Sequence, residues 1–389
     1  MIQALREFLK NWSFLLLWFL VGMKQYYMTW EVAQLYCGGI LVVFCLSYVF
    51  FHLDALVRDS ASKIILAYTL YILVFTSGMC VLGSGTLQGF IDILIFPVLF
   101  LFFYVKVAQR KLSLFSMFLV ALIFVPFAVW NAFRWRGMFD DAGGMSAQSN
   151  AGNFVVALLP FIFLIRSKML RWIAFAGVAV AIFISMKRSG IIIWGGFVLY
   201  ELLFSNFSKR NFIKRVGALF AGGIALVVGW VHFSGTSVAD RIQKRLQLLS
   251  EDGGSGRVDL FFQGISEWRD GALLNWFIGN GAVGSSDFLW GIRYAYHNDI
   301  AESLRALGFL GTLLFISTLS VLGWKSFKYK SQDFPYSELP FVCMMFFVLS
   351  MAMFSPLIGF TYYSMPTIAL MGAAFASCNE QCRIPCIQR

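Results

Sequence analysis

The sequence predicts an all-α membrane protein with about twelve transmembrane helices and a large helical loop between the ninth and the tenth. Of its 389 residues, 59% are hydrophobic and 13% are charged, and the mean hydropathy is +0.74. A soluble domain with a solvated surface does not have this composition. Apolar runs of transmembrane length recur along the chain, each bounded by charges, glycine or proline. Lysine and arginine are concentrated in alternate connections between these runs.

Most predicted spans follow one another through short connections. They cover residues 11–23, 32–53, 63–82, 87–105, 112–130, 151–165, 170–186, 190–207, 216–233, 298–323, 339–357 and 362–378. The first run is short and lacks a small-residue cleavage site, so we expect a retained span rather than a signal peptide. The chain then divides into residues 1–233 with nine helices, a loop at 234–297, three helices at 298–378 and a tail at 379–389.

Basic residues predict which side of the membrane each connection faces, because cytoplasmic connections carry the excess of lysine and arginine. If the N-terminus is inside, the inner segments carry nineteen of them, namely Arg6, Lys10, Arg58, Lys63, Lys106, Arg110, Lys111, Arg166, Lys168, Arg171, Lys209, Arg210, Lys214, Arg215, Lys325, Lys328, Lys330, Arg383 and Arg389. The short outer connections carry five, namely Lys24, Arg134, Arg136, Lys187 and Arg188. We therefore expect both termini in the cytoplasm. The net charge of +11 is then a topology signal, and no nucleic-acid partner is predicted.

Two patterns that often mark a cofactor are interpreted as structural in this chain. Cys378, Cys382 and Cys386 are spaced by four, but Pro385 interrupts the helix and no histidine joins them. The stretch GNGAVG at 279–284 matches GxGxxG, but no βαβ pattern surrounds it, so a tight turn is expected. The sequence thus predicts neither a metal site nor a cofactor. No cysteine lies in the long outer loop, so a disulfide framework is not expected either.

The long loop is predicted to contain two helices. Residues 237–250 have a capping pattern and apolar positions at helical spacing, with basic residues on the other side. This helix is expected at the outer membrane surface, either as an anchor or as a grip on an anionic lipid substrate. A glycine-rich break then leads into a second helix that opens at Arg257.

Basic residues on the outer side are few, so each is informative. Lys187 and Arg188 lie between spans seven and eight, Arg257 opens the second loop helix, and Arg293 lies four residues before His297. A guanidinium presents a planar fork that suits two phosphate oxygens at once. These side chains are therefore candidates to bind a diphosphate. Anchoring at the membrane surface is the alternative, and it is favoured for Lys24 and Arg269.

The tenth span opens with the polar stretch YHNDIAESLRALGFLG at 296–311. We expect a helix from about Asn298, with Glu302 and Arg305 close enough to pair, which lowers the cost of burying either. Such charges are tolerable if the helix lines a hydrated cleft. His297 is the only histidine in a polar cluster, and its imidazole could take a proton from a sugar hydroxyl.

These residues carry a resemblance to a known family. His297 and Asn298, followed after nine residues by Gly308 and then by Gly311, resemble the signature at the end of the large periplasmic loop in the O-antigen ligase and O-antigen polymerase superfamily. The twelve-span topology is similar, as is the outer arginine before small residues in Arg188-Ser189-Gly190. The stretch SGRVDLFFQGISEW resembles the loop segment that carries a further arginine, here Arg257. It departs from the family in having Phe261 in place of the usual tryptophan, and the proline expected before the glycine turn is missing.

The resemblance implies a metal-independent, inverting glycosyltransferase at the periplasmic face of a bacterial inner membrane. Its donor would be an oligosaccharide on undecaprenyl diphosphate, with Arg188 and Arg257 holding the diphosphate and His297 activating the acceptor hydroxyl. A polymerase passes the growing glycan to another lipid-linked repeat, whereas a ligase passes it to lipid A-core. The compact outer loop slightly favours the polymerase, for which a chain-length regulator is a further partner.

The rival class is a lipid-linked oligosaccharide flippase or another transporter. Such proteins usually have repeated halves and broken helices with charges at the membrane midplane. This chain shows no repeated halves, and its polar residues are concentrated on one outer side. The sequence therefore favours the enzyme.

Overall fold

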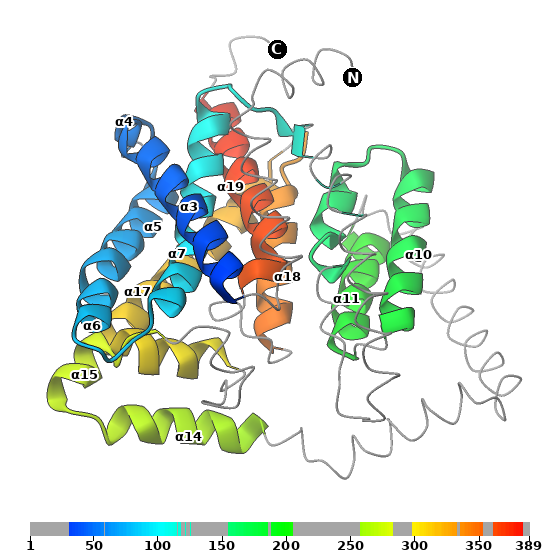
Figure 1. The fold of residues 1–389 in the computed structure, drawn as a ribbon. Coiled ribbons are helices and arrows are strands. Elements are labelled where there is room, and N and C mark those ends of the chain that lie inside the picture. The colour runs from blue at the N-terminus through cyan, green and yellow to red at the C-terminus, as the bar shows by residue number, and fades with distance from the viewer. Residues whose placement is uncertain are drawn as a thin grey trace, which may run out of the picture.

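The computed structural model describes residues 31–57, 59–114, 116–117, 121, 125, 155–185, 188–204, 257–282, 298–332, 335–352 and 361–383. Within these ranges the regular elements are helices, and no strand occurs among them (Figure 1). The all-α class is thus confirmed for this part of the chain. The predicted spans 11–23 and 216–233, most of 112–130 and the predicted helix at 237–250 lie outside it.

The described helices follow one another along the chain with loops or turns between them. They are α3 (Glu31–Phe50), α4 (Leu53–Leu56), α5 (Ser60–Tyr71), the π-helical turn η1 (Ile72–Thr76), α6 (Ser77–Val81), α7 (Leu87–Ala108), the 3₁₀ helix η2 (Leu159–Leu164), α10 (Lys168–Ser185), α11 (Arg188–Phe204), α14 (Arg257–Arg269), α15 (Leu273–Ile278), α17 (Asp299–Lys330), α18 (Leu339–Ala352) and α19 (Thr361–Arg383). In the described residues, three continuous helices are long and apolar enough to cross a membrane: Ser60–Val81, α7 and α17. This indicates a membrane protein.

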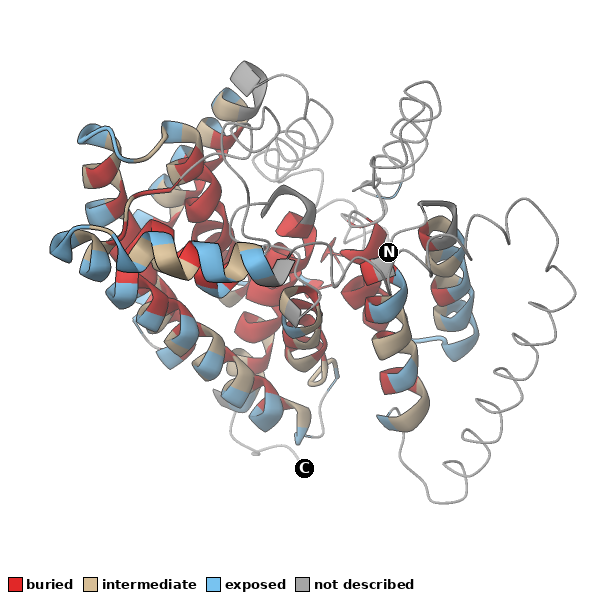
Figure 2. Ribbon diagram, turned by 90° about the horizontal axis from the view of Figure 1, so that it is seen from below, coloured by how far each residue is buried: buried red, intermediate tan, exposed pale blue. Residues whose placement is uncertain are grey.

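Helix α7 lies at the centre of the bundle. The Thr86 hydroxyl caps its start by accepting a hydrogen bond from the Gly89 N–H at 3.1 Å. From Ile91 to Val107 every residue is buried, and the helix packs against α3, α5 and α19. Figure 2, seen from below, shows buried residues gathered in the centre of the bundle and exposed residues on its outer helices. A helix that is apolar on all sides is expected to occupy such a central place.

The contact between α7 and α19 depends on a residue without a side chain. Residues 364–376 of α19 are all buried, and Gly372 faces the backbone of Phe100 in α7. A Cβ at Gly372 would collide with the Phe100 carbonyl oxygen. Small residues allow two helix backbones to approach closely in this way.

One predicted span differs from the structure. Residues 151–165 were expected to form a transmembrane helix, but the described residues 155–165 form turns and η2, with an extended residue at Ile165. Pro160 lacks a backbone N–H and restricts the residue before it, which disfavours a regular α-helix here. The six residues of η2 cover only about 12 Å, less than a membrane crossing.

Basic connections predicted on one side of the membrane meet at one end of the bundle, here called the basic end. At the ends of α3 and α7, the Tyr48 hydroxyl donates to Gln109 Oε1 at 2.9 Å. Beside them, Arg110 Nε lies 3.8 Å from Glu380 Oε2 of α19. The ends of α3, α7 and α19 therefore lie together.

Other helices meet at the same basic end. Lys325 near the end of α17 forms an ion pair with Asp59 at the start of α5. Arg171 at the start of α10 donates to both carboxylate oxygens of Glu201 at the end of α11, at 3.1 and 2.9 Å. Lys330 lies 4.7 Å from the ring centroid of Tyr200 in α11. Helices α11 and α17 thus end at this side, whereas α5 and α10 begin here.

The close contact at Gly372 gives a stability prediction. Gly372→Ala should destabilise the protein by about 1–3 kcal/mol, because α7 and α19 must move apart. Gly323→Ala is the matched control, since a Cβ at Gly323 meets no atom within 4 Å. It should leave stability unchanged or raise it by up to about 1 kcal/mol, since alanine favours helix. Thermal unfolding in detergent measures both, and equal melting temperatures would contradict the packing account.

Candidate functional site

The candidate site lies at the opposite end of the bundle, here called the loop end. It comprises α14, α15, the turn 279–282, the connection 82–86 and the first turns of α17. In Figure 1 these segments lie along the bottom of the molecule, with α14 running beside the beginning of α17. The predicted site residues that fall in described ranges are on or beside these segments, or at the start of α11.

Helices α14 and α15 form a locked pair. The indole of Trp268 donates to the Trp276 carbonyl at 3.0 Å, and the indole of Trp276 donates to the Arg269 carbonyl at 2.8 Å. Leu273 and Leu274 point outward from this pair, with 67% and 61% of their surface exposed. An apolar outer face on a short helix at the end of a bundle suits the membrane surface. The helix predicted to open at Arg257 is therefore present as α14.

The glycine turn joins this pair to α17. Gly279 and Gly281 have φ angles of +84° and +80°, which L side chains rarely adopt. The Asn280 N–H donates to the Arg305 carbonyl at 2.7 Å, and the Gly281 N–H donates to the Ala306 carbonyl at 3.1 Å. The turn predicted for GNGAVG is thus confirmed at 279–282, and its last two residues lie outside the described part.

The turn fits against a kink in α17. At Gly308 the helix leaves its path, with φ +66°, and a Cβ there would overlap the backbone of Gly279 and Phe277. The Tyr71 hydroxyl donates to the Leu307 carbonyl at 2.6 Å beside this kink. The segment before Gly308 therefore lies across the loop end (Figure 1), and the expectation of one straight span from residue 298 is wrong.

Glu302 and Arg305 form the predicted ion pair. Arg305 Nη2 lies 3.1 Å from Glu302 Oε1, and the two side chains are 3% and 6% exposed. Arg305 Nη1 also donates to the Gly281 carbonyl at 3.4 Å. The pair is buried in protein contacts rather than lining a hydrated cleft, because the kink at Gly308 packs this segment against the turn. Its role is thus to fix the start of α17.

Asn298 caps α17. Its Oδ1 accepts hydrogen bonds from the N–H groups of Ile300 at 2.9 Å and Ala301 at 3.2 Å. Asparagine is among the best residues at this position. The helix start predicted near Asn298 is therefore confirmed, and its amide is engaged in the cap. His297 precedes the cap directly and lies outside the described residues, so its catalytic role stays a prediction.

Helix polarity places the proposed arginine positions at the loop end. Arg188 begins α11, which runs antiparallel to α10 and ends at the basic end with Glu201. Arg257 begins α14, which packs against α17 and α15. The side chains of both arginines lie outside the described part. The backbone starts of α11 and α17 therefore share one end, with α14 beside α17.

The remaining predicted site residues are not described. Lys187 and Arg293 lie outside the described ranges and stay predictions. Among the residues that are described, no group of three or more histidine, cysteine, aspartate or glutamate side chains could hold a metal ion.

Arg269 shows how a basic residue at this end can be neutralised locally. Its Nε donates to Asp270 Oδ1 at 3.0 Å, and the Ser266 hydroxyl donates to Asp270 Oδ2 at 3.1 Å. These hydrogen bonds, that of Arg269 first, lower the pKa of the Asp270 carboxyl. The carboxylate therefore stays charged at neutral pH, and Arg269 carries a partner of its own. This fits the surface role expected from the sequence.

The sequence did not reveal the part played by Tyr71. It lies 236 residues before its acceptor Leu307, at the end of α5 in a predicted span. A lone tyrosine in an apolar run has no local pattern that would mark it. Gly308 and Gly311, in contrast, were noticed as part of a motif, and the structure gives each a packing reason: a Cβ at Gly311 would meet Leu307 and the Tyr71 ring.

No protein-family model matches the chain, and no curated protein matches it in sequence.

The buried ion pair gives a second prediction. Arg305→Met should destabilise the protein by about 3–5 kcal/mol, because the Glu302 carboxylate is left buried without its partner. The double variant Glu302→Leu/Arg305→Met should recover much of this loss. Arg269→Met removes one partner of an exposed pair and should change stability little. Denaturation in detergent measures all three, and an Arg305→Met protein as stable as the original would contradict the assignment.

Proposed function

We propose that the chain is a glycosyltransferase of the bacterial inner membrane with twelve spans, both termini in the cytoplasm and its active site at the loop end, facing the periplasm. It moves a glycan from undecaprenyl diphosphate to a sugar hydroxyl, with inversion and without a metal. The loop at 234–297 separates nine spans from three. The O-antigen polymerase form is favoured because this loop is compact.

One observation carries the proposal. Helices α11 and α17 begin at the loop end, and α14 packs beside α17, so Arg188, Arg257 and the residue before Asn298 come from three distant parts of the chain to one end. The basic connections gather at the other end. An excess of lysine and arginine is typical of the cytoplasmic side, which supports a periplasmic loop end.

The chemistry requires few groups. The acceptor oxygen attacks the anomeric carbon, its proton passes to the His297 imidazole, and the bond from that carbon to the diphosphate oxygen breaks with its electrons staying on the diphosphate. Attack opposite the leaving group inverts the anomeric centre. Arg188 and Arg257, with Arg293 as a third candidate, stabilise the negative charge that develops on the leaving diphosphate.

Neighbouring residues position these groups. Asn298 caps α17 directly after His297, and the Glu302–Arg305 pair fixes the same segment to the glycine turn. This arrangement would hold the imidazole at a defined place above the start of the helix. Lys187 adds a second positive charge next to Arg188.

The identity of the acceptor is tested with purified protein and a lipid-diphosphate repeat unit alone. A ladder of products supports the polymerase, and transfer only after lipid A-core is added supports the ligase. Translocation in vesicles without any glycan transfer would instead support the flippase or transporter class and reject the enzyme.

The proposed base gives a third prediction. His297→Ala should reduce transfer by roughly 10²-fold or more, because proton removal from the acceptor is lost. His52→Ala is the matched control, since His52 lies at the basic end, where its Nδ1 is 2.8 Å from the Tyr48 carbonyl. It should retain activity. Both proteins should reach the membrane in normal amounts, and full transfer by His297→Ala would reject the catalytic role.

The proposed diphosphate contacts give a fourth prediction. Arg188→Ala and Arg257→Ala should each lower kcat/KM for the lipid-diphosphate donor by roughly 10²-fold, because each removes a charged donor to the leaving group. Arg188→Lys should recover only part of the rate, since an ammonium cannot make a bidentate contact. Arg269→Ala, on the same helix as Arg257, is the control and should stay near the original rate. Equal rates for all four proteins would exclude the proposed contacts.

A further inference from the structure

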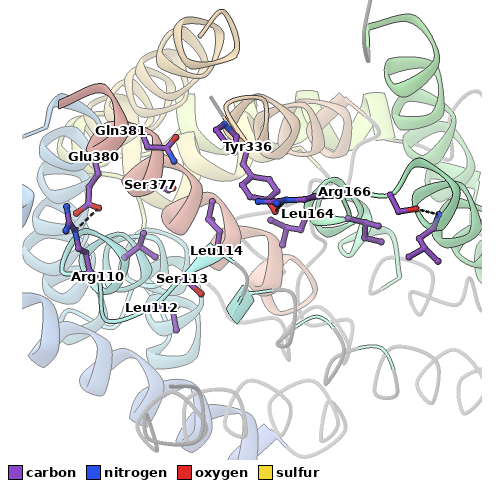
Figure 3. Close-up of a pocket in the computed structure, with 15 residues that line it drawn as sticks. Arg110, Leu112, Ser113, Leu114, Leu164, Arg166, Tyr336, Ser377, Glu380 and Gln381 are labelled. Atoms are coloured by element: carbon purple, nitrogen blue, oxygen red, sulfur yellow. Dashed lines mark hydrogen bonds and ion pairs between the residues drawn. The ribbon is translucent and has the colours of Figure 1, made fainter. Parts of the chain in front are cut away.

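A cavity at the basic end has no part in the proposed transfer. Its volume is about 1050 Å³, and it lies between the end of α7, residues 112–114, the end of α19, residues 164–170 and Pro335–Tyr336 (Figure 3). Five separate parts of the chain thus form its wall. Its place at the end of α7 sets it apart from the loop end.

Two arginines supply the charge of the cavity. Arg166 Nε donates to the Tyr336 hydroxyl at 3.1 Å, and no described residue accepts from its two terminal nitrogens. Arg110 lies 3.8 Å from Glu380 and makes no hydrogen bond through its guanidinium to the described residues. Among the described residues that line the cavity, Glu380 is the one acidic group, so the wall carries an excess of positive charge.

Backbone conformation also sets this cavity apart. Arg110 and Tyr336 have φ angles of +57° and +65°, and they are the two non-glycine residues with positive φ in the described chain. Both line the cavity. Glycine would be the least strained residue at either position. Strain of this kind is often kept where a side chain serves a function.

The depth of the cavity suits an amphiphile. Helix α7 is long and apolar enough to cross a membrane and ends at Ala108, so Val107 and Arg110 lie level with the membrane surface. Leu112, Leu114 and Leu164 give the cavity apolar wall as well. Basic pockets between transmembrane helices at the cytoplasmic surface bind phospholipid headgroups.

We propose that this cavity binds the phosphate headgroup of an anionic phospholipid from the membrane leaflet at the basic end. Arg110 and Arg166 contact the phosphate oxygens, the Tyr336 hydroxyl orients Arg166, and the apolar wall receives the glycerol and the first acyl carbons. The lipid joins α7 and α19 to the segment that leads into α10. This site is independent of the proposed glycan transfer.

Native mass spectrometry of the purified, delipidated full chain tests the proposal with three probes: short-chain phosphatidylglycerol, short-chain phosphatidylcholine and inorganic phosphate. Phosphatidylglycerol should bind at least about tenfold more tightly than either of the others, because only it combines net negative charge with apolar carbons. Equal affinity for the two lipids would overturn the proposal. Inorganic phosphate binding as tightly as phosphatidylglycerol would show that the ligand is a soluble anion and overturn the lipid assignment.

Two variants separate binding from folding. Arg110→Gly suits the left-handed backbone, so it should unfold at no lower temperature than the original yet bind phosphatidylglycerol about tenfold more weakly. Arg166→Lys keeps the charge and should weaken binding by a smaller factor. Arg269→Ala removes an exposed arginine with an acidic partner at the loop end and should bind normally. Unchanged affinity in Arg110→Gly and Arg166→Lys together would overturn the assignment.

Discussion

The backbone contact between Gly279 and Gly308 determines how the loop end is built. Neither residue can carry a Cβ, because each would overlap the backbone of the other segment. The contact has two consequences for α17. It bends the charged segment with Glu302 and Arg305 away from the helix axis, and it leaves Phe309–Lys330 as a straight part of about 33 Å, close to the thickness of the hydrocarbon core. The charged residues therefore do not have to cross the membrane.

The same geometry separates two kinds of basic residue. At the basic end, cations are held by acidic or aromatic partners such as Glu201, Asp59 and the Tyr200 ring, which ties the helix ends together. At the loop end, Arg305 is consumed by the buried pair and Arg269 by Asp270. The arginines proposed to bind a diphosphate, Arg188 and Arg257, each begin a helix there. In our account, chemistry and lipid anchoring thus occupy opposite ends.

Much of this could be predicted from the sequence because membrane helices announce themselves by length and hydropathy. The range of α7, the start of α17 at Asn298, the Glu302–Arg305 pair and the turn at Gly279 were all predicted from local patterns. The kink at Gly308 was not, because a glycine inside an apolar run is compatible with a straight helix until its neighbour is known. Tyr71 and the cavity at Arg110 and Arg166 likewise depend on contacts between distant segments, which no local pattern encodes. The residues 151–165 misled because hydropathy outweighed the effect of Pro160.

The central claim is that one imidazole and two guanidiniums meet around a diphosphate at the loop end. An experimental map of the protein in a lipid nanodisc, with an undecaprenyl-diphosphate oligosaccharide bound, tests it most directly. Our account predicts phosphate density within about 4 Å of the Arg188 and Arg257 guanidiniums, with His297 facing the anomeric carbon. Density for the diphosphate at the basic end, or side chains of these three residues lying far apart, would contradict it.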